Sequence, residues 1–557
     1  MTQTPNVDET LLEAATEWAA ADPDQSTATE LRDLIGRATG GDETAVAELV
    51  DAFDGTLQFG TAGLRGRLGP GSNRMNRVVV SRAAAGLAQY LVQTGGSTVV
   101  IGFDARRNSD VFARDTAEIM AAAGIRAYVF PRHLPTPVLA FAIHHLGTSA
   151  GVMVTASHNP PDDNGYKVYL GDGSQIVPPA DAEIATCIAA VGPVAQIPRS
   201  DDYETLDESV LDAYVARAVS LVSPGGARDI TAVYTAMHGV GGEVFMRAVR
   251  DAGFPAPDPV SQQFEPDGRF PTVHFPNPEE PGAMDLALAE AREVGADIVI
   301  ANDPDADRCA AGIPADGDWR MLSGDEVGSL LGWWIVERGR RSGTPASGVM
   351  AESIVSGTLL HRIAEAAGLG YEATLTGFKW ISRVPGLVFG YEEALGYCVD
   401  PRAVTDKDGI SASLLMLEMA ATLKAEGKGP QDVLDDLARQ FGLHKTSQVA
   451  VRVADISLIA DAMARLRQSP PSQLGGRTVT EMADLSAGVD GLPPTDGLRF
   501  IMDGARVIIR PSGTEPKLKC YLQVVVPVND DDVPAAGVLA DAEMTALRED
   551  VSAALGL

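Results

Sequence analysis

The sequence is poor in several features that would assign it to a particular class of protein. Its four cysteines, Cys187, Cys309, Cys398 and Cys520, lie far apart and form no CxxC pair. A disulfide framework or zinc knuckle is therefore not expected, and a reducing cytoplasm fits. No apolar run approaches the roughly 18 residues that cross a membrane. The N-terminus lacks the basic start and apolar stretch of a signal peptide. We therefore expect a cytoplasmic protein without a membrane span.

Positive charge is also scarce. The chain has 44 lysines and arginines against 76 aspartates and glutamates, a formal net charge of -32 at pH 7. Such a chain repels nucleic acid and anionic lipid at long range, so neither is an expected partner. A site for a small anionic ligand would need a local cluster of cations.

What is present indicates several α/β domains. With 557 residues, 45% hydrophobic and 22% charged, the chain predicts three or four globular domains. Residues 8–50 have helical spacing of apolar residues. Short apolar runs then alternate with helical patterns: 98–103, 126–130, 151–156, 229–237, 296–302 and 347–355. Buried strands alternating with helices are typical of doubly wound α/β layers. The C-terminal part instead combines strand-like runs with helices at 456–467 and 533–554, an α+β pattern.

The strongest local signal is TASHNP at 155–160, which directly follows an apolar strand. Proline fixes φ and turns the chain away from the sheet, so we expect Ser157 on a rigid, exposed loop. Its hydroxyl there could act as a nucleophile or carry a phosphate. Lys167 could return toward it on the next strand. Because Ser, Asn and Pro are common turn residues, an ordinary turn is the alternative.

A second signal, NDPDADR at 302–308, also ends an apolar strand. Asp303, Asp305 and Asp307 alternate, and oxygens two residues apart can converge on one hard cation in a tight loop. The glycine and distal glutamate of an EF-hand are missing. The three carboxylates suit a small cation that keeps a position open for another oxygen. The alternative is a plain acidic loop on an acidic protein.

Three further segments are weaker when each is taken alone. RPSGTEPK at 510–517 offers an arginine fork and an anion-binding turn, or an ordinary turn. FGYEEALGY at 389–397 offers paired glutamates that could accept hydrogen bonds from ligand hydroxyls, or that favour a helix N-terminus. FGTAGLRGRLG at 59–69 is glycine-rich but lacks the GK[ST] ending of a Walker loop.

Together and in this order, the five segments resemble the α-D-phosphohexomutase superfamily, which includes phosphoglucomutases and phosphomannomutases. The resemblance runs from about residue 55 to 525. QFGTAGLRGRLGPGSNRMN, TAMHGVGG and TGFKWI are similar to its phosphoglucomutase-2-like branch, which contains phosphopentomutase-like enzymes. The resemblance implies an α/β fold of four domains around a central cleft, with three related α/β domains and a C-terminal α+β domain similar to the TATA-binding protein.

We expect four domains, each with its own role. The N-terminal helices and the phosphoserine domain take residues 1–221, and the metal-binding domain takes 222–320. The sugar-binding domain takes 321–440 and the phosphate-binding domain takes 441–557.

The resemblance also implies roles for individual residues. Ser157 would be the phosphoserine and, with Asp303, Asp305 and Asp307, would bind Mg²⁺. The catalytic set would be Ser157, His158, Lys167, Arg65 and Arg308, with either Lys167 or His158 moving the hydroxyl proton. Contacts to the substrate would come from nine residues: Gly377, Lys379, Glu392, Glu393, Arg510, Ser512, Gly513, Thr514 and Lys517.

One position departs from the pattern. Many hexomutases have Gly-Glu-x-Ser in the sugar loop, whereas this chain has Tyr391-Glu392-Glu393-Ala394. Ala394 removes a hydroxyl contact to the sugar and is similar to the pentomutase-like branch, so specificity for a hexose is left open.

The implied activity is an intramolecular phosphotransfer that interconverts a sugar 1-phosphate and a 6-phosphate. It would pass through phosphoserine and need a sugar 1,6-bisphosphate as activator. Glucose is the first candidate sugar and mannose the second. A phosphopentomutase acting on ribose 1- and 5-phosphates is the alternative, and a metal-dependent phosphatase or a silent sugar-phosphate-binding protein are rivals. Phospho-sugars are the only expected partners, and the sequence does not indicate an oligomeric state.

Overall fold

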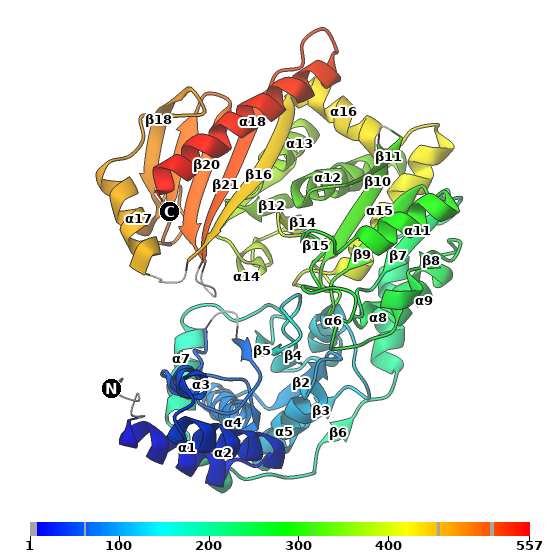
Figure 1. Ribbon diagram of the computed structural model, residues 1–557. Coiled ribbons are helices and arrows are strands. Elements are labelled where there is room, and N and C mark those ends of the chain that lie inside the picture. Colours follow the sequence, from blue (N-terminus) through cyan, green and yellow to red (C-terminus); the bar gives the residue numbers. More distant parts are fainter. Residues whose placement is uncertain (1–7, 61–62, 316, 454–456, 513–516, 557) are drawn as a thin grey trace. The chain divides into compact units, whose positions relative to one another are not determined.

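The computed structural model describes residues 8–556 except 61–62, 316, 454–456 and 513–516 (Figure 1). The chain forms two compact units. The first comprises Met1–Arg320 and Asp400–Glu418, and the second comprises Met321–Val399 and Met419–Leu557. The chain therefore passes from one unit to the other three times.

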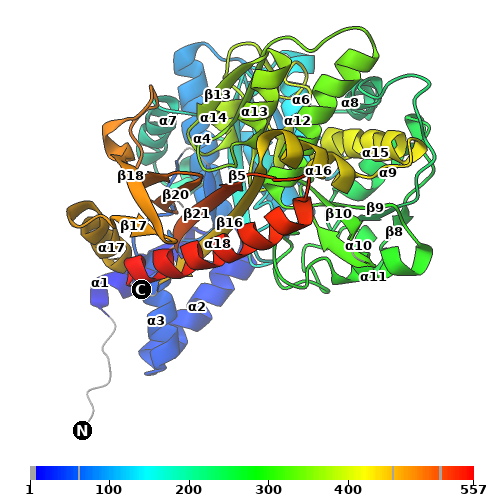
Figure 2. The same ribbon diagram turned by 90° about the horizontal axis from the view of Figure 1, so that it is seen from above.

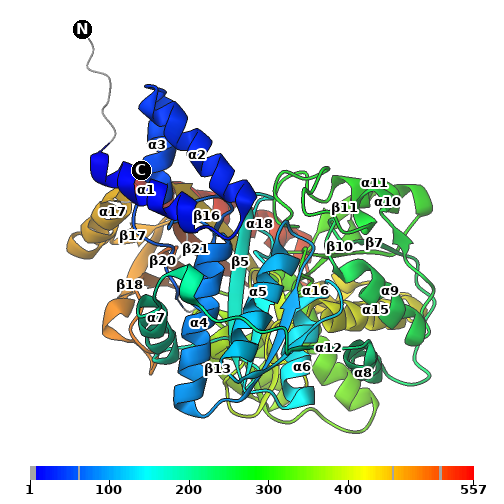
Figure 3. The ribbon, with the colours of Figure 1, turned by 90° about the horizontal axis from the view of Figure 1, so that it is seen from below.

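Three helices open the first unit: α1 (Glu9–Ala21), α2 (Gln25–Thr39) and α3 (Glu43–Phe53). Each begins after an aspartate whose side chain accepts hydrogen bonds from first-turn N–H groups: Asp8, Asp24 and Asp42. These caps satisfy donors that a helix start leaves unpaired. The three helices lie side by side in Figure 3. Their buried apolar residues, among them Leu31 and Leu49, form one cluster. The helical prediction for residues 8–50 is confirmed.

After these helices, the first sheet of the first unit has the strand order β1-β5-β4-β2-β3-β6. Its strands are β1 (Leu64–Arg67), β2 (Thr98–Phe103), β3 (Arg126–Val129), β4 (Ala150–Val154), β5 (Asp163–Leu170) and β6 (Glu204–Thr205). The associated helices are α4 (Arg77–Thr94), α5 (Ser109–Ala122), α6 (Thr136–Leu146), α7 (Ala180–Ala189), the short η1 (Val194–Gln196) and α8 (Ser209–Ser220).

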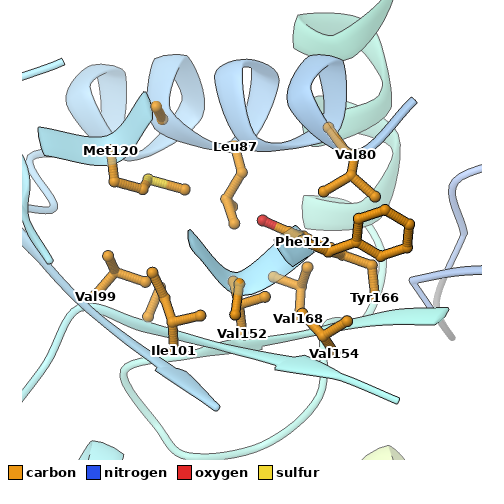
Figure 4. Close-up of a cluster of buried hydrophobic side chains, with 14 of the residues drawn as sticks. Val80, Leu87, Val99, Ile101, Phe112, Met120, Val152, Val154, Tyr166 and Val168 are labelled. Carbon is orange, nitrogen blue, oxygen red and sulfur yellow. The ribbon is translucent and has the colours of Figure 1, made fainter. Parts of the chain in front are cut away.

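The two faces of this sheet are covered by different helices. Leu87 of α4 and Phe112 of α5 pack on Val152 and neighbouring strand residues (Figure 4). Side chains alternate between faces along a strand, so Gly151 faces the other side. A Cβ at Gly151 would lie 2.5 Å from the side chain of Ile143 in α6. Glycine at this position therefore allows α6 to approach the second face closely.

The second sheet has the order β11-β10-β9-β7-β8. Its strands are β7 (Ala232–Thr235), β8 (Asp258–Pro259), β9 (Ile298–Asn302), β10 (Cys309–Ala315) and β11 (Asp318–Met321). Its helices are α9 (Gly241–Asp251), α10 (Ser261–Phe264), α11 (Asp285–Val294) and α15 (Gly409–Ala425).

The third sheet lies in the second unit and has the order β13-β12-β14-β15. Its strands are β12 (Val349–Ser353), β13 (Gly370–Thr374), β14 (Leu387–Glu392) and β15 (Gly396–Cys398). The accompanying helices are α12 (Gly324–Arg341), α13 (Leu359–Ala367), α14 (Phe378–Ile381) and α16 (Pro430–Phe441).

These three sheets share one core arrangement. The orders β3-β2-β4-β5, β8-β7-β9-β10 and β13-β12-β14-β15 correspond strand for strand. In each, the first three strands are parallel and the fourth is antiparallel. The TASHNP and DPDADR segments follow β4 and β9, and the EEAL segment begins at the last residue of the equivalent strand β14. Loops at the carboxyl end of parallel strands are where α/β domains place ligand sites. The prediction of three related α/β domains is confirmed.

The C-terminal part of the second unit is an antiparallel sheet of order β16-β21-β20-β19-β18-β17. Its elements are β16 (Leu443–Arg452), α17 (Ser457–Gln468), β17 (Gln473–Leu474), β18 (Arg477–Asp484), η2 (Leu485–Ala487), β19 (Leu498–Met502), β20 (Ala505–Pro511), β21 (Lys517–Val526) and α18 (Val533–Leu555). The long α18 runs across the sheet (Figure 2). This confirms the α+β pattern. None of the helices described is long and apolar enough to cross a membrane.

Candidate active site

Ser157 lies just beyond β4 in a loop that the backbone of the first unit holds tightly. Its φ is 53°, in the left-handed region that non-glycine residues rarely adopt. The Ser157 N–H donates to Thr155 Oγ1 at 2.8 Å. Only 2% of Ser157 is exposed, so the prediction of an exposed serine was wrong. The reason is that the aspartate loop after β9 packs directly on it.

Asp303, Asp305 and Asp307 converge beside this serine. Their ligand oxygens lie within 4.8 Å of one another, and all three residues are buried. The Ser157 hydroxyl donates to Asp303 Oδ2 at 2.8 Å. The structure therefore brings together the serine and the three carboxylates, as the resemblance implies.

The residues present at this cluster fit a metal ion. Asp305 Oδ1 and Asp307 Oδ1 are buried and have no hydrogen-bond partner among the described residues. Leaving a buried carboxylate oxygen unpaired is unfavourable. Burial, followed by the charges of Asp305 and Asp307, raises the pKa of Asp303 well above its usual range. A hard cation among these oxygens would relieve both the unpaired atoms and the repulsion.

Two lysines partly neutralise the negative charge of the three carboxylates. Lys167 Nζ lies 2.7 Å from Asp305 Oδ2 and 3.0 Å from Asp307 Oδ2. Lys407 Nζ lies 3.2 Å from Asp307 Oδ2. Burial opposes ionisation of Asp307, but Lys167, Lys407 and Arg308 outweigh it and hold the pKa of Asp307 below its usual range. The lysines thus contact the Oδ2 atoms of the two aspartates, whereas the oxygens that a cation could use are the Oδ1 atoms.

Sequence reasoning missed several residues of this cluster. Lys407 approaches it from the segment before α15, and Asp406 accepts a hydrogen bond from Lys407 Nζ at 3.3 Å. Thr136 at the start of α6 donates its hydroxyl to Asp305 Oδ2 at 2.6 Å. The run TDKDG at 405–409 was the available signal for Lys407, because lysine is rare in this chain. Thr136 has no comparable local signal.

The other predicted catalytic residues also lie at this site. His158 Nδ1 is 3.3 Å from Ser157 Oγ. Burial, followed by the charges of Arg308 and Arg65, lowers the pKa of His158 well below its usual range. Arg65 on β1 donates to Asn159 Oδ1 at 3.2 Å. Arg308 Nε lies 3.9 Å from Asp303 Oδ2. All five residues of the predicted catalytic set are therefore neighbours in the first unit.

The predicted sugar and phosphate contacts lie in the second unit. Glu392 ends β14, and Glu393 follows it. Gly377, with φ of 109°, precedes α14, which contains Lys379. Arg510 lies near the end of β20.

A backbone hydrogen bond joins Ser512, directly after β20, to Lys517 at the start of β21. The Ser512 N–H donates to the Lys517 carbonyl at 2.8 Å. Gly513 and Thr514 lie outside the described residues. Burial, followed by the charge of Glu393, raises the pKa of Tyr521 on β21, and Arg510 acts in the opposite direction. The segments predicted to bind the phosphate and the sugar, which contain Arg510 and Glu393, therefore both act electrostatically on Tyr521.

Three equivalent α/β domains, a fourth α+β domain and a buried serine beside an aspartate triad are the features of a phosphosugar mutase, and the comparisons agree. Family models for phosphoglucomutase/phosphomannomutase match in order: alpha/beta/alpha domain I at 56–193, domain II at 212–315, domain III at 323–441 and the C-terminal domain at 449–527. The chain belongs to the phosphoglucomutase/phosphomannomutase family.

Its relatives carry different names for their sugars. The chain is 51% identical over 456 residues to a probable phosphomannomutase of Haemophilus influenzae, covering 80% of this chain and 92% of that protein. It is 35% identical over 560 residues to a probable phosphoribomutase of Schizosaccharomyces pombe, covering 93% and 94%. A crystal structure of a Thermus thermophilus protein assigned to the phosphomannomutases matches with a TM-score of 0.70 and 25% identity, covering 89% of this chain and 99% of that one. The protein is a phosphosugar mutase. Its family membership favours this activity over the two rival functions, a metal-dependent phosphatase and a silent sugar-phosphate-binding protein.

Proposed function

We propose that this mutase interconverts sugar 1-phosphates and sugar 6-phosphates through a phosphorylated Ser157 and a sugar bisphosphate. The observation that carries the proposal is the 2.8 Å contact from Ser157 Oγ to Asp303 Oδ2, inside a triad that has unpaired buried oxygens. Of the other residues that the resemblance implies, His158 lies 3.3 Å from this hydroxyl, Lys167 and Arg308 contact the aspartates, and Arg65 contacts the neighbouring Asn159.

Mg²⁺ is the cation that we propose for this site, held by Asp303, Asp305 and Asp307. When bound, it neutralises charge on the phosphoryl group during transfer. The donor set of carboxylates and one hydroxyl-type oxygen is what a hard cation prefers.

In each half-reaction the chain's own residues do the rest. The Oγ–P bond of phosphoserine 157 breaks, a bond from a sugar hydroxyl oxygen to the same phosphorus forms, and the hydroxyl proton must leave. His158, whose lowered pKa leaves the imidazole neutral, can accept that proton at Nδ1. Lys167, kept as an ammonium by Asp305 and Asp307, can supply a proton to the departing Ser157 oxygen. In the second half-reaction the other phosphate of the bisphosphate returns to Ser157 and the proton moves back. The burial of Ser157 and Lys167 supports this scheme, because water would otherwise hydrolyse the phosphoenzyme.

The loops of the second unit supply substrate contacts in this proposal. Arg510 grips the phosphate that is not reacting, with Ser512, Gly513, Thr514 and Lys517 around it. Lys379 and Gly377 line the sugar site, and Glu392 accepts hydrogen bonds from ring hydroxyls. The bidentate fork of an arginine matches phosphate geometry well.

We propose glucose as the preferred sugar, with mannose and ribose phosphates also accepted. Glu392 retains the carboxylate that pairs with ring hydroxyls, whereas Ala394 cannot add a hydroxyl contact. The named activities of the relatives, phosphomannomutase and phosphoribomutase, are consistent with a site that is not restricted to one sugar. A dedicated phosphopentomutase is the second candidate, and the alanine favours it.

The test is phosphorylation of Ser157. After incubation with glucose 1,6-bisphosphate and Mg²⁺, peptide mass spectrometry should locate one phosphate on Ser157, and Ser157→Ala should carry none and show no turnover. Full turnover by Ser157→Ala would contradict the proposal. Coupled assays with glucose, mannose and ribose 1-phosphates then distinguish the two candidates, since a strict preference for ribose 1-phosphate would favour the pentomutase.

A further inference from the structure

The sugar loop is the tight turn between β14 and β15, and one side of this hairpin is anchored on its surroundings. The Tyr391 hydroxyl donates to Asp325 Oδ1 at 2.9 Å, and the Tyr397 hydroxyl donates to the Gly324 carbonyl at 3.1 Å. Both acceptors belong to the first turn of α12. Tyr391 and Tyr397 are opposite each other across the two strands.

Glu393 is held on the same side of the hairpin. Its Oε2 accepts hydrogen bonds from Ser353 Oγ at 2.9 Å and Ser356 Oγ at 3.1 Å. Its own N–H donates to Ser356 Oγ at 3.2 Å. Both serines lie at the carboxyl end of β12, the strand parallel to β14. The side chain of Glu393 is therefore occupied by the protein.

The backbone of Glu393 is equally constrained. A Cβ placed on Gly324 would lie 1.8 Å from the Glu393 carbonyl oxygen. Glycine at position 324 is what allows α12 and the sugar loop to lie this close. Glu393 is thus fixed through its carboxylate, its N–H and its carbonyl.

Glu392 lies between Tyr391 and Glu393. Successive side chains along a strand point to opposite sides, so the anchored side of the hairpin holds Tyr391 and Glu393 and leaves Glu392 on the other. Two adjacent ionised carboxylates also repel each other. Burial, followed by the charges of Glu392 and Asp325, raises the pKa of Glu393 to about 7. Glu393 therefore takes up a proton more readily than an ordinary glutamate, which reduces the repulsion.

We propose that Glu393 is a positioning residue, which fixes the sugar loop on Ser353, Ser356 and Gly324, and that Glu392 alone of the pair contacts the substrate hydroxyls. The proposal rests on the proposed function, because it assumes a sugar phosphate as substrate. It replaces the expectation that Glu393 binds the substrate directly. It also identifies Ser353 and Ser356, at the carboxyl end of β12, as residues that set sugar affinity without touching the sugar.

The test compares affinities for glucose 6-phosphate, measured by calorimetry, together with kcat and KM. Glu393→Ala should weaken binding by about tenfold or more, because it frees the loop. Glu393→Gln should recover most of that loss, because an amide oxygen can accept from both serine hydroxyls. Glu392→Gln should stay weakened by about tenfold or more, since a charged acceptor for the sugar is lost. Gly324→Ala should weaken binding although both glutamates are intact, because the added methyl displaces the Glu393 carbonyl.

Two matched controls separate loop positioning from general damage. Glu372→Gln changes an exposed glutamate on β13 of the same sheet. Gly537→Ala adds a methyl in α18 that meets no atom within 4 Å. Both should bind and turn over like the wild type, and thermal unfolding should show that every variant is folded.

The outcomes distinguish this inference from the proposed function. If the wild type binds glucose 6-phosphate and Glu393→Gln is as weak as Glu393→Ala, Glu393 acts through its charge on the sugar, and the positioning role is wrong. If Gly324→Ala is folded and binds normally, the role of the backbone contact is wrong. A wild-type protein that is phosphorylated on no residue and binds no sugar phosphate would overturn the proposed function as well.

Discussion

The Arg106 guanidinium donates a hydrogen bond to the Ser157 carbonyl, with Nη2 2.6 Å from the oxygen. The same guanidinium reaches the carbonyls of Asn159 at 2.6 Å, Pro160 at 2.7 Å and Asp163 at 3.1 Å. One buried arginine on the loop after β2 therefore holds four carbonyls of the loop after β4. Since a left-handed φ costs a non-glycine residue roughly 1–2 kcal/mol, these bonds help to maintain the conformation of Ser157.

Arg106→Lys should therefore lower kcat by about 10–100-fold while changing KM for the sugar phosphate less, because a displaced serine misaligns the reacting atoms. An ammonium cannot span four carbonyls as a guanidinium does. Arg107→Lys is the matched control, since the neighbouring Arg107 is exposed. Steady-state kinetics with both variants is the measurement. A wild-type kcat in a folded Arg106→Lys protein would show that Arg106 does not position the serine.

Asp305→Asn should lower kcat by about 100-fold or more, because it removes a charged ligand from the proposed Mg²⁺ site. Excess EDTA should abolish turnover in the wild type, and added Mg²⁺ should restore it. Asp110→Asn, an exposed aspartate on α5, is the control and should behave like the wild type. Activity that persists in EDTA would mean that the triad does not serve the reaction through a metal.

Arg510→Ala should raise KM for the monophosphate and lower kcat, for a combined loss of about 10–100-fold in kcat/KM. A charge-assisted hydrogen bond is worth about 1.5–3 kcal/mol, and loss of grip on the distal phosphate also loosens the reacting hydroxyl. Arg439→Ala removes an arginine of α16 whose partner is the exposed Asp436, and it should change neither constant. If the two variants behaved alike, Arg510 would be an ordinary surface residue.

Ala394→Ser should sharpen the preference for hexoses over ribose. A site that pairs a substrate hydroxyl rejects analogues lacking it, because a polar group is left unpaired. The wild-type methyl imposes no such penalty, so we expect discrimination of only about 10–200-fold between related sugars. The measurement is kcat/KM for glucose, mannose and ribose 1-phosphates in both proteins. A wild type that is strictly specific for one sugar would contradict the expectation.

Glu352→Gln should remove a pH dependence of stability from the second unit. Glu352 is buried and accepts a hydrogen bond from the Tyr371 hydroxyl at 2.6 Å, and its Oε2 has no partner among the described residues. Burial raises the pKa of Glu352 from 4.5 to about 8. At pH values between 4.5 and about 8, Glu352 is protonated in the folded state and ionised in the unfolded state.

The free energy of unfolding should therefore fall as the pH rises from about 5 to 8, by up to about 1.4 kcal/mol per pH unit. The glutamine stays neutral at every pH, so its unfolding free energy should be flatter over this range. Urea unfolding at pH 5.5 and pH 8 measures the difference, with Glu365→Gln on the surface of α13 as the control. Parallel pH dependences in the wild type and Glu352→Gln would contradict the raised pKa.

Strands and helices were predictable because each depends on local periodicity. The run at 98–103, for example, coincides with β2. Ser157 and the aspartates were also recognisable, since each motif is contiguous and directly follows a buried strand. The domain boundaries and the individual residue roles stay predictions.

Other site residues could not be predicted because they act across distant parts of the sequence. Arg106 reaches Ser157 only because β2 and β4 are neighbours in the sheet, and Thr136 reaches Asp305 only because α6 meets the loop after β9. Periodicity does not reveal such strand order. The burial of Ser157 was missed for the same reason, since the residues that cover it come from another domain.

The segment Asp400–Glu418 belongs to the first unit although the chain has by then built part of the second. Its acidic residues meet polar groups of the earlier chain: the Tyr214 hydroxyl donates to Asp408 at 2.8 Å, the Tyr169 hydroxyl donates to Asp406 at 2.8 Å and Arg217 pairs with Asp400 at 2.6 Å. During synthesis on a ribosome, the buried tyrosines must therefore wait for their acceptors until residue 408 has emerged. A nascent chain halted near residue 320 exposes these unmet donors, and a recombinant fragment cut there is expected to be a substrate for chaperones and proteases rather than an autonomous domain.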